Sequence, residues 1–424
     1  MTAIDLEKVR ARFPSLRAGY IYADNAGGSQ VCQEVLDRIF DYLCNTNVQP
    51  GAAYSVSEQS SQRILEGINA AALLFNAAST VEVGFGSSTG LIFENISRAM
   101  ENDITVGDEI IITEEHEAHC GPWKRLADRR GAVVKYWRTM VTSENNPFSL
   151  GYNLHDLLLL LSPKTRLVAI SACSNVLGSV MPIEDIVSAL RKRARELMTP
   201  KLEVSVDCVA YAPHRRINVQ KWDVDYCVCS LYKVYGAHNA VFYMRSGALQ
   251  SSLSKIVHHF VAAESSARKI EIGGPGYELV YSAAGVVSYL LALTPYHSLD
   301  ASFDAIAEYE QHLMKPLLSF LTDQKQYERG VRVVGNGKVD ESRVPTISFV
   351  VVGQTPIKSQ NIVNFFDSKG GIGIRYGHFY AYSLVANMNP RIDPDDGVVR
   401  ISFVHYNTVK EVERILEVLK EVLA

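Results

Sequence analysis

The sequence predicts an α/β fold, in which a mostly parallel β-sheet is covered by helices and is followed by a smaller α+β region. Two observations support it. Short apolar segments typical of buried strands alternate with amphipathic helical segments from about residue 80 to 245. Polar residues follow several of these strands, and would then share the sheet edge where open α/β sheets bind ligands. A chain of 424 residues can form a large core and more than one domain.

The chain before this alternation begins with a short helix at 5–13 and a strand at 20–23. That strand leads into a turn at 24–30, whose small residues let a ligand approach the backbone. Helices follow at about 31–46 and 57–76. The strands expected next are 81–85, 108–113, 132–137, 166–171, 203–207, 226–229 and 240–244, and the helices are 91–100, one from about 122, 153–161 and 182–198.

The last third of the chain predicts a different arrangement. An apolar helix runs from 276 to about 293, and Pro295 marks a boundary. The elements expected beyond it are a helix at 299–322, a strand at 344–352, a helix at 359–369, a strand at 398–403 and a final amphipathic helix at 408–423.

Composition excludes several classes of function. The net charge of -4 gives no basic surface for nucleic acid, and no apolar run is long enough to span a membrane. Residues 1–8 are charged and lack the apolar core of a signal peptide. The seven cysteines are scattered without a C-x-x-C pair, which indicates reduced thiols in a cytoplasmic protein, and we interpret Cys173 and Cys208 as core residues.

Residues 225–236 predict a short buried strand, a polar turn and then Lys233. A lysine at the end of a strand, among tyrosines and apolar residues, is partly desolvated. Its amine can then be neutral and nucleophilic, and can form a Schiff base with a carbonyl cofactor. On this segment alone, a surface lysine after a strand is the favoured alternative.

The turn at 86–90 joins a strand to a helix. Its hydroxyls, Ser87 and Ser88, lie at a helix N-terminus, where free N–H groups and the helix dipole favour a phosphate. The same glycine-rich turn also fits a loose dinucleotide-binding pattern, and a capped helix without a ligand is the third interpretation.

Glu115, His116 and His119 have a spacing close to that of metal ligands. The zinc helix motif places its histidines four residues apart, however, and here they are three apart. Pro122 also predicts that these residues lie in a turn before the helix, so we expect no metal. His116 at the end of a strand can instead present its ring to a ligand, or be a structural histidine.

The residues that follow strands form one chemical set. Pyridoxal phosphate requires a lysine, an acid to hold its ring nitrogen protonated, a flat ring to stack on it and hydroxyls for its phosphate. Asp207 and Lys233 are 26 residues apart, with a helix-free connection and a strand between them, which fits adjacent strand ends. The candidates are Ser87, Ser88, His116, Asn175, Asp207, Ser230 and Lys233.

Eight short and different motifs follow one another along nearly the whole chain. They lie at 24–28, 86–89, 115–118 with 122–123, 174–178, 206–207 with 212–214, 230–236, 374–378, and 399–400 with 406–408. In order and spacing they resemble the class V aminotransferase, or cysteine desulfurase-like, family of fold-type I pyridoxal phosphate enzymes. The resemblance implies a large domain with a seven-stranded sheet and a smaller C-terminal domain, divided as 1–30 (joining the small domain), 31–295 and 296–424.

The resemblance also implies roles for single residues. Lys233 would form the internal aldimine and move the α-proton, Asp207 would pair with the pyridine nitrogen, and His116 would stack on the ring. The phosphate would be held by Ser87, Ser88, Ser230 and Tyr232, and Asn175 would lie near the phenolic oxygen. Arg400 would bind the substrate carboxylate, with Arg375, Asn25 and Tyr380 nearby. The family forms homodimers with active sites at the interface, where Gly274 would contact the partner's phosphate site through its backbone.

The chain departs from the family at three positions. Tyr380 stands where desulfurases carry their nucleophilic cysteine, so a persulfide mechanism is not expected. Ala210 replaces a glutamine beside the cofactor, and Tyr232 replaces a histidine. The chain resembles a branch that includes carbon–sulfur lyases of ergothioneine synthesis and ring-forming enzymes of fungal alkaloid pathways such as the loline route.

We therefore expect an enzyme that forms an α-carbanion, or quinonoid, from an amino acid in specialised metabolism. Mannich-type cyclisation to a pyrrolizidine-like ring is favoured over β-elimination by a carbon–sulfur lyase, and over transamination or epimerisation. An aromatic pocket would suit a bulky or cationic substrate, although these side chains could equally fill a domain interface. It would comprise Tyr22, Tyr376, Phe379, Tyr380 and Tyr382. A nicotinamide oxidoreductase and a catalytically inactive scaffold are the alternatives from other classes.

Overall fold

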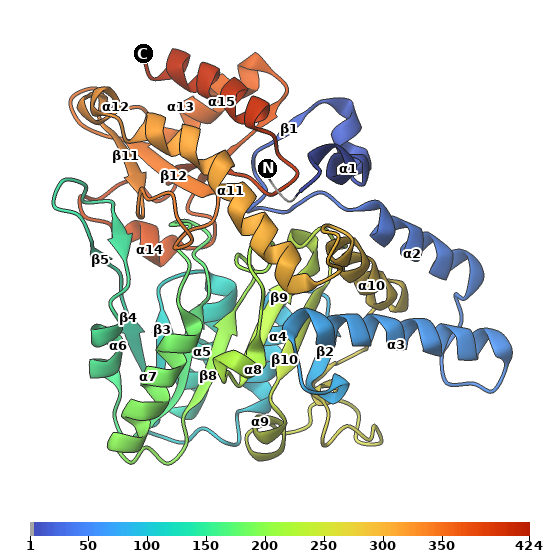
Figure 1. Ribbon diagram of the computed structural model, residues 1–424. Coiled ribbons are helices and arrows are strands. Elements are labelled where there is room, and N and C mark those ends of the chain that lie inside the picture. Colours follow the sequence, from blue (N-terminus) through green and yellow to red (C-terminus); the bar gives the residue numbers. More distant parts are fainter. Residues whose placement is uncertain (1–3) are drawn as a thin grey trace.

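The computed structural model describes residues 4–424 and contains two main sheets (Figure 1). Residues 1–3, the start of the stretch inspected for a signal peptide, lie outside the described residues. The larger sheet has seven strands in the order β2-β10-β9-β8-β7-β3-β4, and only β10 runs antiparallel to its neighbours. The predicted mostly parallel sheet is confirmed. Its strands are β2 (Val83–Gly86), β3 (Glu109–Thr113), β4 (Val133–Trp137), β7 (Thr165–Ser171), β8 (Glu203–Asp207), β9 (Tyr226–Ser230) and β10 (Ala240–Met244).

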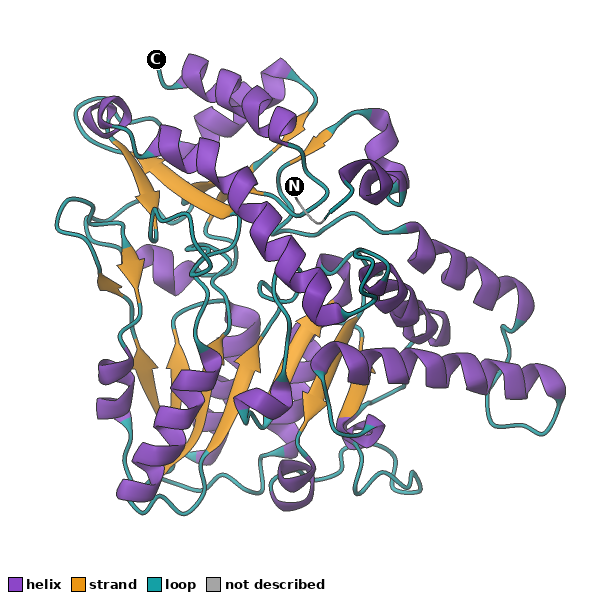
Figure 2. Ribbon diagram, in the orientation of Figure 1, coloured by secondary structure: helices purple, strands orange, loops and turns teal. Residues whose placement is uncertain are grey.

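Both faces of this sheet are buried. Ile111 of β3 packs into the core cluster that contains the apolar side of α7, whereas Ile110 and Ile112 pack into a second cluster with α4 and α5. Helices therefore cover the sheet on two sides (Figure 2), which explains the near-continuous apolar strands. The helices associated with this sheet are α4 (Thr89–Ala99), α5 (Glu117–Arg130), α6 (Leu154–Leu160), α7 (Ile183–Glu196), α8 (Val219–Trp222) and α9 (Ser246–Ser251).

The start of the chain reaches the C-terminal part of the molecule. Strand β1 (Ile21–Tyr22) pairs in parallel with β13 (Ile372–Gly373), and Asp24 forms a β-bridge with Ser402. After this segment, α2 and α3 extend toward the right of Figure 1 and pack against α10. The helices are α1 (Leu6–Ala11), α2 (Gln33–Asn45), α3 (Ser55–Phe75) and α10 (Tyr277–Leu291).

The C-terminal part contains a four-stranded antiparallel sheet in the order β11-β12-β15-β14. Residues 292–298 connect α10 to α11, so the proposed boundary at 295 falls between two helices, and the division into domains stays a prediction. The elements are α11 (Leu299–Leu321), α12 (Gln324–Arg329), α13 (Ser359–Lys369), α14 (Tyr382–Ala386), α15 (Val409–Val422), β11 (Val331–Val334), β12 (Thr346–Val351), β14 (Arg375–Gly377) and β15 (Val398–Ser402).

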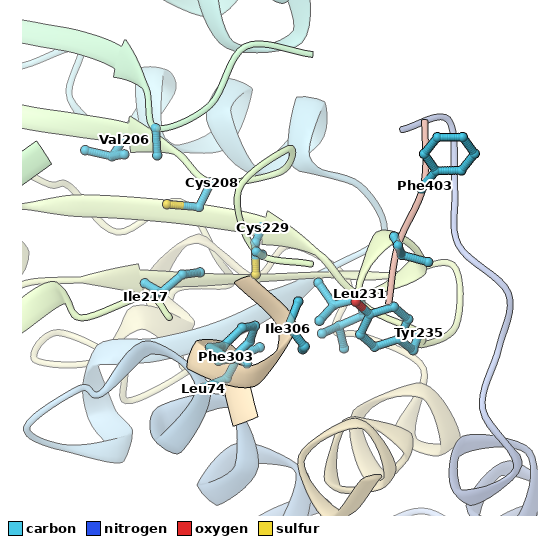
Figure 3. Close-up of a cluster of buried hydrophobic side chains, with 14 of the residues drawn as sticks. Leu74, Val206, Cys208, Ile217, Cys229, Leu231, Tyr235, Phe303, Ile306 and Phe403 are labelled. Carbon is cyan, nitrogen blue, oxygen red and sulfur yellow. The ribbon is translucent and has the colours of Figure 1, made fainter. Parts of the chain in front are cut away.

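A buried apolar cluster lies where helix α11 meets the ends of β8 and β9 (Figure 3). Phe303 and Ile306 of α11 belong to the same cluster as Leu231, which follows β9. Cys208 and Cys229 are fully buried in it, which confirms the interpretation of Cys208 as a core residue. The cluster fixes the ends of β8 and β9, where Asp207 and Lys233 lie.

Two local predictions are wrong. Helix α5 begins at Glu117 with His116 as its N-cap, and Pro122 lies inside the helix. A proline at its sixth position removes one backbone hydrogen bond without ending the helix. The connection from Asp207 to Lys233 contains the four-residue helix α8, so it is not helix-free.

Several short elements were not predicted, including the β5–β6 hairpin (Met140–Val141 and Leu150–Gly151). The expected longer helices and strands are confirmed within a few residues. No helix among residues 4–424 combines the length and apolar character needed to cross a membrane.

Candidate active site

Four of the residues predicted to act together line one cavity at the C-terminal edge of the larger sheet. They are His116, Asn175, Asp207 and Lys233. Asp207 is the last residue of β8, and Lys233 ends a single 3-10 turn directly after β9, the neighbouring strand. Adjacent parallel strands thus bring the acid and the lysine to the same edge, as the spacing predicted.

Lys233 is almost completely buried, with 5% of its surface exposed. Burial lowers the pKa of its amine to about 8, and the nearby Arg400 acts in the same direction, whereas Asp207 and Asp24 oppose the shift. At pH 7 roughly a tenth of this amine is therefore uncharged, and the uncharged form is the one that acts as a nucleophile or a base.

Asp207 is also buried, and burial raises the pKa of its carboxyl to about 6. Its Oδ1 accepts a hydrogen bond of 2.8 Å from the Val209 N–H. Among residues 4–424 this carboxylate forms no ion pair, although the charge of Lys233 lowers its pKa and so opposes the effect of burial. A buried carboxylate of this kind gains most from a partner that supplies a positive N–H.

His116 closes the cavity from the start of α5. Its Nδ1 accepts from the Ala118 N–H at 3.2 Å, which orients the ring. Burial, together with the charges of Lys233 and Arg400, lowers the pKa of His116 to about 4, so the ring is neutral at physiological pH. Tyr380 stacks on it, with ring centroids 5.3 Å apart and an interplanar angle of 26°.

Glu115 belongs to this site, and sequence reasoning missed it as a functional residue. Its carboxylate accepts from Ser174 Oγ at 2.8 Å and from the Tyr152 hydroxyl at 3.1 Å. Burial raises its pKa to about 7, and the charge of Asp207 acts in the same direction. Because Ser174 precedes Asn175, Glu115 links the His116 turn to the Asn175 turn.

Asn175 connects the cavity to the C-terminal part of the molecule. Its Nδ2 donates to the Phe379 carbonyl at 2.8 Å, and its own main-chain carbonyl accepts from Arg400 Nη1 at 3.1 Å. The Phe379 ring covers the Arg400 guanidinium at 3.7 Å. Phe379 and Tyr380 both have positive φ angles, of 51° and 61°, which are uncommon for such bulky residues.

Arg400 and Arg375 are brought together by an aspartate that sequence reasoning did not single out. Arg400 Nη2 lies 3.0 Å from Asp24 Oδ1, and Arg375 Nη2 lies 2.8 Å from Asp24 Oδ2. Arg400 is buried, whereas the Arg375 side chain is 59% exposed. The only signal in the sequence was the motif at 24–28, because the partners of Asp24 lie some 350 or more residues further along the chain.

The predicted phosphate ligands lie further apart from one another than the residues around Lys233. Ser88 caps α4 by accepting from the Leu91 N–H at 3.3 Å, and both Ser87 and Ser88 are exposed. Ser87 and Gly274 line a separate cavity of about 140 Å³. Ser230 Oγ is fully buried without a hydrogen-bond partner in residues 4–424. Tyr232 is half-buried and lies beside Gly28.

Other predictions need correction. Asn25 is buried, and its Nδ2 donates to the carbonyls of Tyr22 and Ser402, at 2.7 and 2.9 Å, while its Oδ1 accepts from the Tyr406 hydroxyl. The amide therefore holds the turn together and has no donor left for a substrate. Cys173 is buried but lines the Lys233 cavity, so it is more than a core residue.

The histidine at 119, considered above as a metal ligand, is buried against Phe93 with Nε2 3.4 Å from Ser205 Oγ. No group of three or more potential metal ligands occurs in the described residues.

The residues present fit pyridoxal phosphate. Lys233 provides an amine with a lowered pKa, and Asp207 provides a buried carboxylate without a cationic partner. His116 provides a neutral ring, and the unpartnered Ser230 hydroxyl provides a donor for an anionic oxygen. These are the amine, acid, ring and hydroxyl that the cofactor requires.

The model of one protein family, described as Aminotransferase class-V, matches residues 21–415. An aminotransferase-like protein of Gibberella zeae is 38% identical, over 100% of this chain and 99% of its own length. A cysteine desulfurase-like protein of Aspergillus flavus is 30% identical, over 99% of this chain and 91% of its own. The solved apo structure of a cysteine desulfurase from Thermococcus onnurineus superimposes with a TM-score of 0.81 at 21% identity, covering 99% of this chain and 98% of that one.

Proposed function

The chain belongs to the aminotransferase class-V family, whose cofactor is pyridoxal phosphate, and on this premise we propose that it removes the α-proton of an amino acid and forms a carbon–carbon bond in a Mannich-type cyclisation. One observation carries the proposal: Lys233, with its lowered pKa, is buried in one cavity with Asp207, in a site where Tyr380 stands at the position of the family's nucleophilic cysteine.

Pyridoxal phosphate supplies an electron sink that makes the α-proton of a bound amino acid acidic. Lys233 is the residue placed to take that proton, because its amine is buried and partly uncharged near pH 8. Asp207 would hold a proton at the cofactor's ring nitrogen, and His116 would stack on its ring. Glu115 and Asn175 fix the two turns that border them.

Arg400 binds the substrate carboxylate. The guanidinium is buried, is held by the Asn175 carbonyl and is covered by the Phe379 ring. A fixed guanidinium recognises a carboxylate by direction as well as by charge, so the α-carbon is oriented toward Lys233. This orientation determines which of its bonds is broken.

Sulfur transfer through a protein persulfide is the reaction that the site supports least. Position 380 carries a phenol, and the one thiol that lines the Lys233 cavity belongs to Cys173. Burial raises the pKa of Cys173 above its usual value, so the thiol stays protonated and is a poor nucleophile. The proposed reaction therefore forms a carbon–carbon bond and does not transfer sulfur to a protein thiol.

The rim of the site favours a substrate larger than a simple amino acid. Tyr380 and Tyr382 are 68% and 53% exposed, which supports a rim open to a ligand rather than the domain-interface alternative considered from the sequence. Tyr22 lines an open cavity of about 320 Å³ beside Asp24 and Arg375. Exposed aromatic side chains and a roomy cavity lined by Tyr22 can accommodate an iminium or another cationic group.

Carbon–sulfur bond cleavage by β-elimination is the second candidate. It uses the same α-proton removal and needs no protein thiol, and the Aspergillus flavus relative is named as cysteine desulfurase-like. Transamination or epimerisation would result if the carbanion were reprotonated.

We also propose a homodimer in the cytoplasm. The dinucleotide interpretation of residues 84–90 gains no support, since Gly84 lies within β2 and Gly90 in the first turn of α4.

The visible spectrum of the purified protein tests the proposal. We expect pyridoxal phosphate to give an absorption band that borohydride bleaches and that Lys233→Ala lacks. Lys269→Met is the matched control, because Lys269 is another buried lysine, bonded to the carbonyls of Leu249 and Leu253. It should retain the band. A wild-type protein that stays colourless with added cofactor would refute the mechanism.

The fate of the carbanion needs a second measurement. Incubation of the loaded enzyme with amino acids in D2O should exchange the α-proton, as followed by NMR. A cyclised product without release of sulfide or an oxo acid supports the first candidate. Release of a thiol or sulfide supports the second.

A further inference from the structure

Asp24 bridges the two arginines of the proposed substrate site. Its Oδ1 lies 3.0 Å from Arg400 and its Oδ2 lies 2.8 Å from Arg375. The two guanidinium groups differ in environment, because Arg400 is 2% exposed and Arg375 is 59% exposed in the side chain. One carboxylate thus connects a buried cation to one in contact with solvent.

Arg400 has no other acidic partner among residues 4–424. Its Nη1 donates to the Asn175 carbonyl, and its buried Nε has no hydrogen-bond partner in that range. A buried guanidinium with an unused N–H and a single carboxylate is under-satisfied, since the group has five donors. Burial lowers the pKa of Arg400 to about 10, and Asp24 opposes this shift.

The surroundings of Asp24 leave it room to move. The carboxylate lies at the wall of the 320 Å³ cavity, which is also lined by Tyr22, Gly27 and Arg375. A Cβ atom added to Gly27 would lie 3.0 Å from Asp24 Oδ2, so the glycine leaves the carboxylate space that a larger residue would narrow. Apart from the two arginines, no group in the described chain donates a hydrogen bond to its side chain.

We propose that Asp24 occupies, in the free enzyme, the position that the substrate carboxylate takes on Arg400, and that Arg375 retains Asp24 after its displacement. The inference rests on the proposed function, because it concerns the carboxylate subsite of that reaction. Exchange of one carboxylate for another never leaves Arg400 as an unpaired buried charge. Asp24 is then an internal competitor that lowers the affinity for every carboxylate ligand.

A purely orienting role for Asp24 predicts the opposite change in the affinity for a carboxylate ligand. If Asp24 only held Arg400 in place, its loss would weaken the binding of a carboxylate. If Asp24 competes, removal of its charge strengthens that binding. Asn keeps the size of the side chain and one acceptor oxygen, so Asp24→Asn separates the two roles.

The test measures the dissociation constant of L-alanine from the change it causes in the visible band of the loaded enzyme. We expect Asp24→Asn to bind L-alanine about tenfold more tightly than wild type, a difference of about 1.4 kcal/mol. Ethylamine, which has the amine but no carboxylate, should bind both proteins equally. Asp128→Asn, an exposed aspartate on α5 far from the motif at 24–28, is the control variant and should match wild type.

A second readout needs no cofactor. Acetate should raise the unfolding midpoint of cofactor-free Asp24→Asn more than that of wild type, compared at equal ionic strength with chloride, because a ligand stabilises the state that binds it. The proposed function and this inference fail differently. If no amino acid changes the wild-type band, the proposed function is refuted. If L-alanine binds wild type but binds Asp24→Asn equally or more weakly, the inference is refuted.

Discussion

The inner and outer halves of the site are built in different ways. The inner half consists of His116, Asp207 and Lys233, which lie at or just after the ends of strands of one sheet and are closely packed. The outer half, with Tyr22, Asp24 and Arg375, is assembled from the two ends of the chain and opens into a cavity of about 320 Å³.

The difference separates reaction type from substrate choice. The inner residues are desolvated. Burial shifts the pKa values of Lys233 and Asp207 toward neutrality, which prepares proton transfer, and it lowers the pKa of His116 so that its ring stays neutral. The outer residues are half-buried or exposed and can rearrange around different groups. Under the proposed function, residues on the sheet would carry out the reaction, and the loops and chain ends would select the substrate.

The largest effect is expected from Asp207→Asn, which alters the inner half alone. The variant should still bind the cofactor, but α-proton exchange should fall by at least about 10²-fold, because the ring nitrogen loses its acid. Exchange followed by NMR in D2O, beside Asp128→Asn, measures this. Exchange at the wild-type rate would show that the inner half does not set the chemistry.

Arg400→Gln and Arg375→Gln test the boundary between the halves. The loss of buried Arg400 should weaken amino-acid binding by about 10²-fold, consistent with about 2–5 kcal/mol for one partner of a buried charge pair. The loss of exposed Arg375 should cost less than about tenfold, because exposed ion pairs contribute at most about 1 kcal/mol. Spectral titration with L-alanine compares them. Equal losses of L-alanine affinity in the two variants would contradict the division of the site into an inner and an outer half.

Glu115→Gln should change how stability depends on pH. Burial raises the folded-state pKa of Glu115 to about 7, so its carboxyl keeps a proton that the unfolded chain loses near pH 4.5. The resulting stabilisation is complete at low pH and is lost as the pH rises to about 7. We expect wild type to lose on the order of 2 kcal/mol relative to Glu115→Gln between about pH 4.5 and pH 8.

Urea unfolding of the cofactor-free proteins across this pH range gives the comparison. Parallel pH curves for the two proteins would show that folding does not change the pKa of Glu115, which would contradict this prediction.

The smallest effect is expected at the outer rim. Tyr380→Phe should behave like wild type, because the ring alone stacks on His116. Tyr380→Ala should lose about 0.5–1.5 kcal/mol of binding, the contribution of an aromatic pair. Dissociation constants from the visible band measure both. A loss of activity in Tyr380→Phe would assign a chemical role to the hydroxyl and make position 380 part of the inner half.

Local patterns predicted the inner half well. Strand periodicity located Asp207 and Lys233, because Asp207 ends its strand, Lys233 lies one short turn after the neighbouring strand, and parallel strands end together. Glu115 was missed because an acid beside a histidine looked like part of a metal motif. Its role depends on Ser174 and Tyr152, which are distant in the sequence.

Local patterns predicted the outer half poorly. Asn25 was taken for a substrate ligand, whereas its amide binds residues at both ends of the chain, Tyr22 and Ser402. Asp24 was overlooked because Arg400 is 376 residues away. A motif shows that a turn matters, but only the fold shows whether its side chains face a ligand or each other.

The pairing of β1 with β13 also determines when the site is completed as the ribosome makes the chain. Lys233 and its neighbours on the large sheet have all been synthesised by residue 244, when β10 can pair with β9 and β2. Residues 21–24 must wait for residues 372–402 before their strand and bridge partners exist. A nascent chain or a C-terminally shortened one would therefore hold the residues of the cofactor site without a complete carboxylate site.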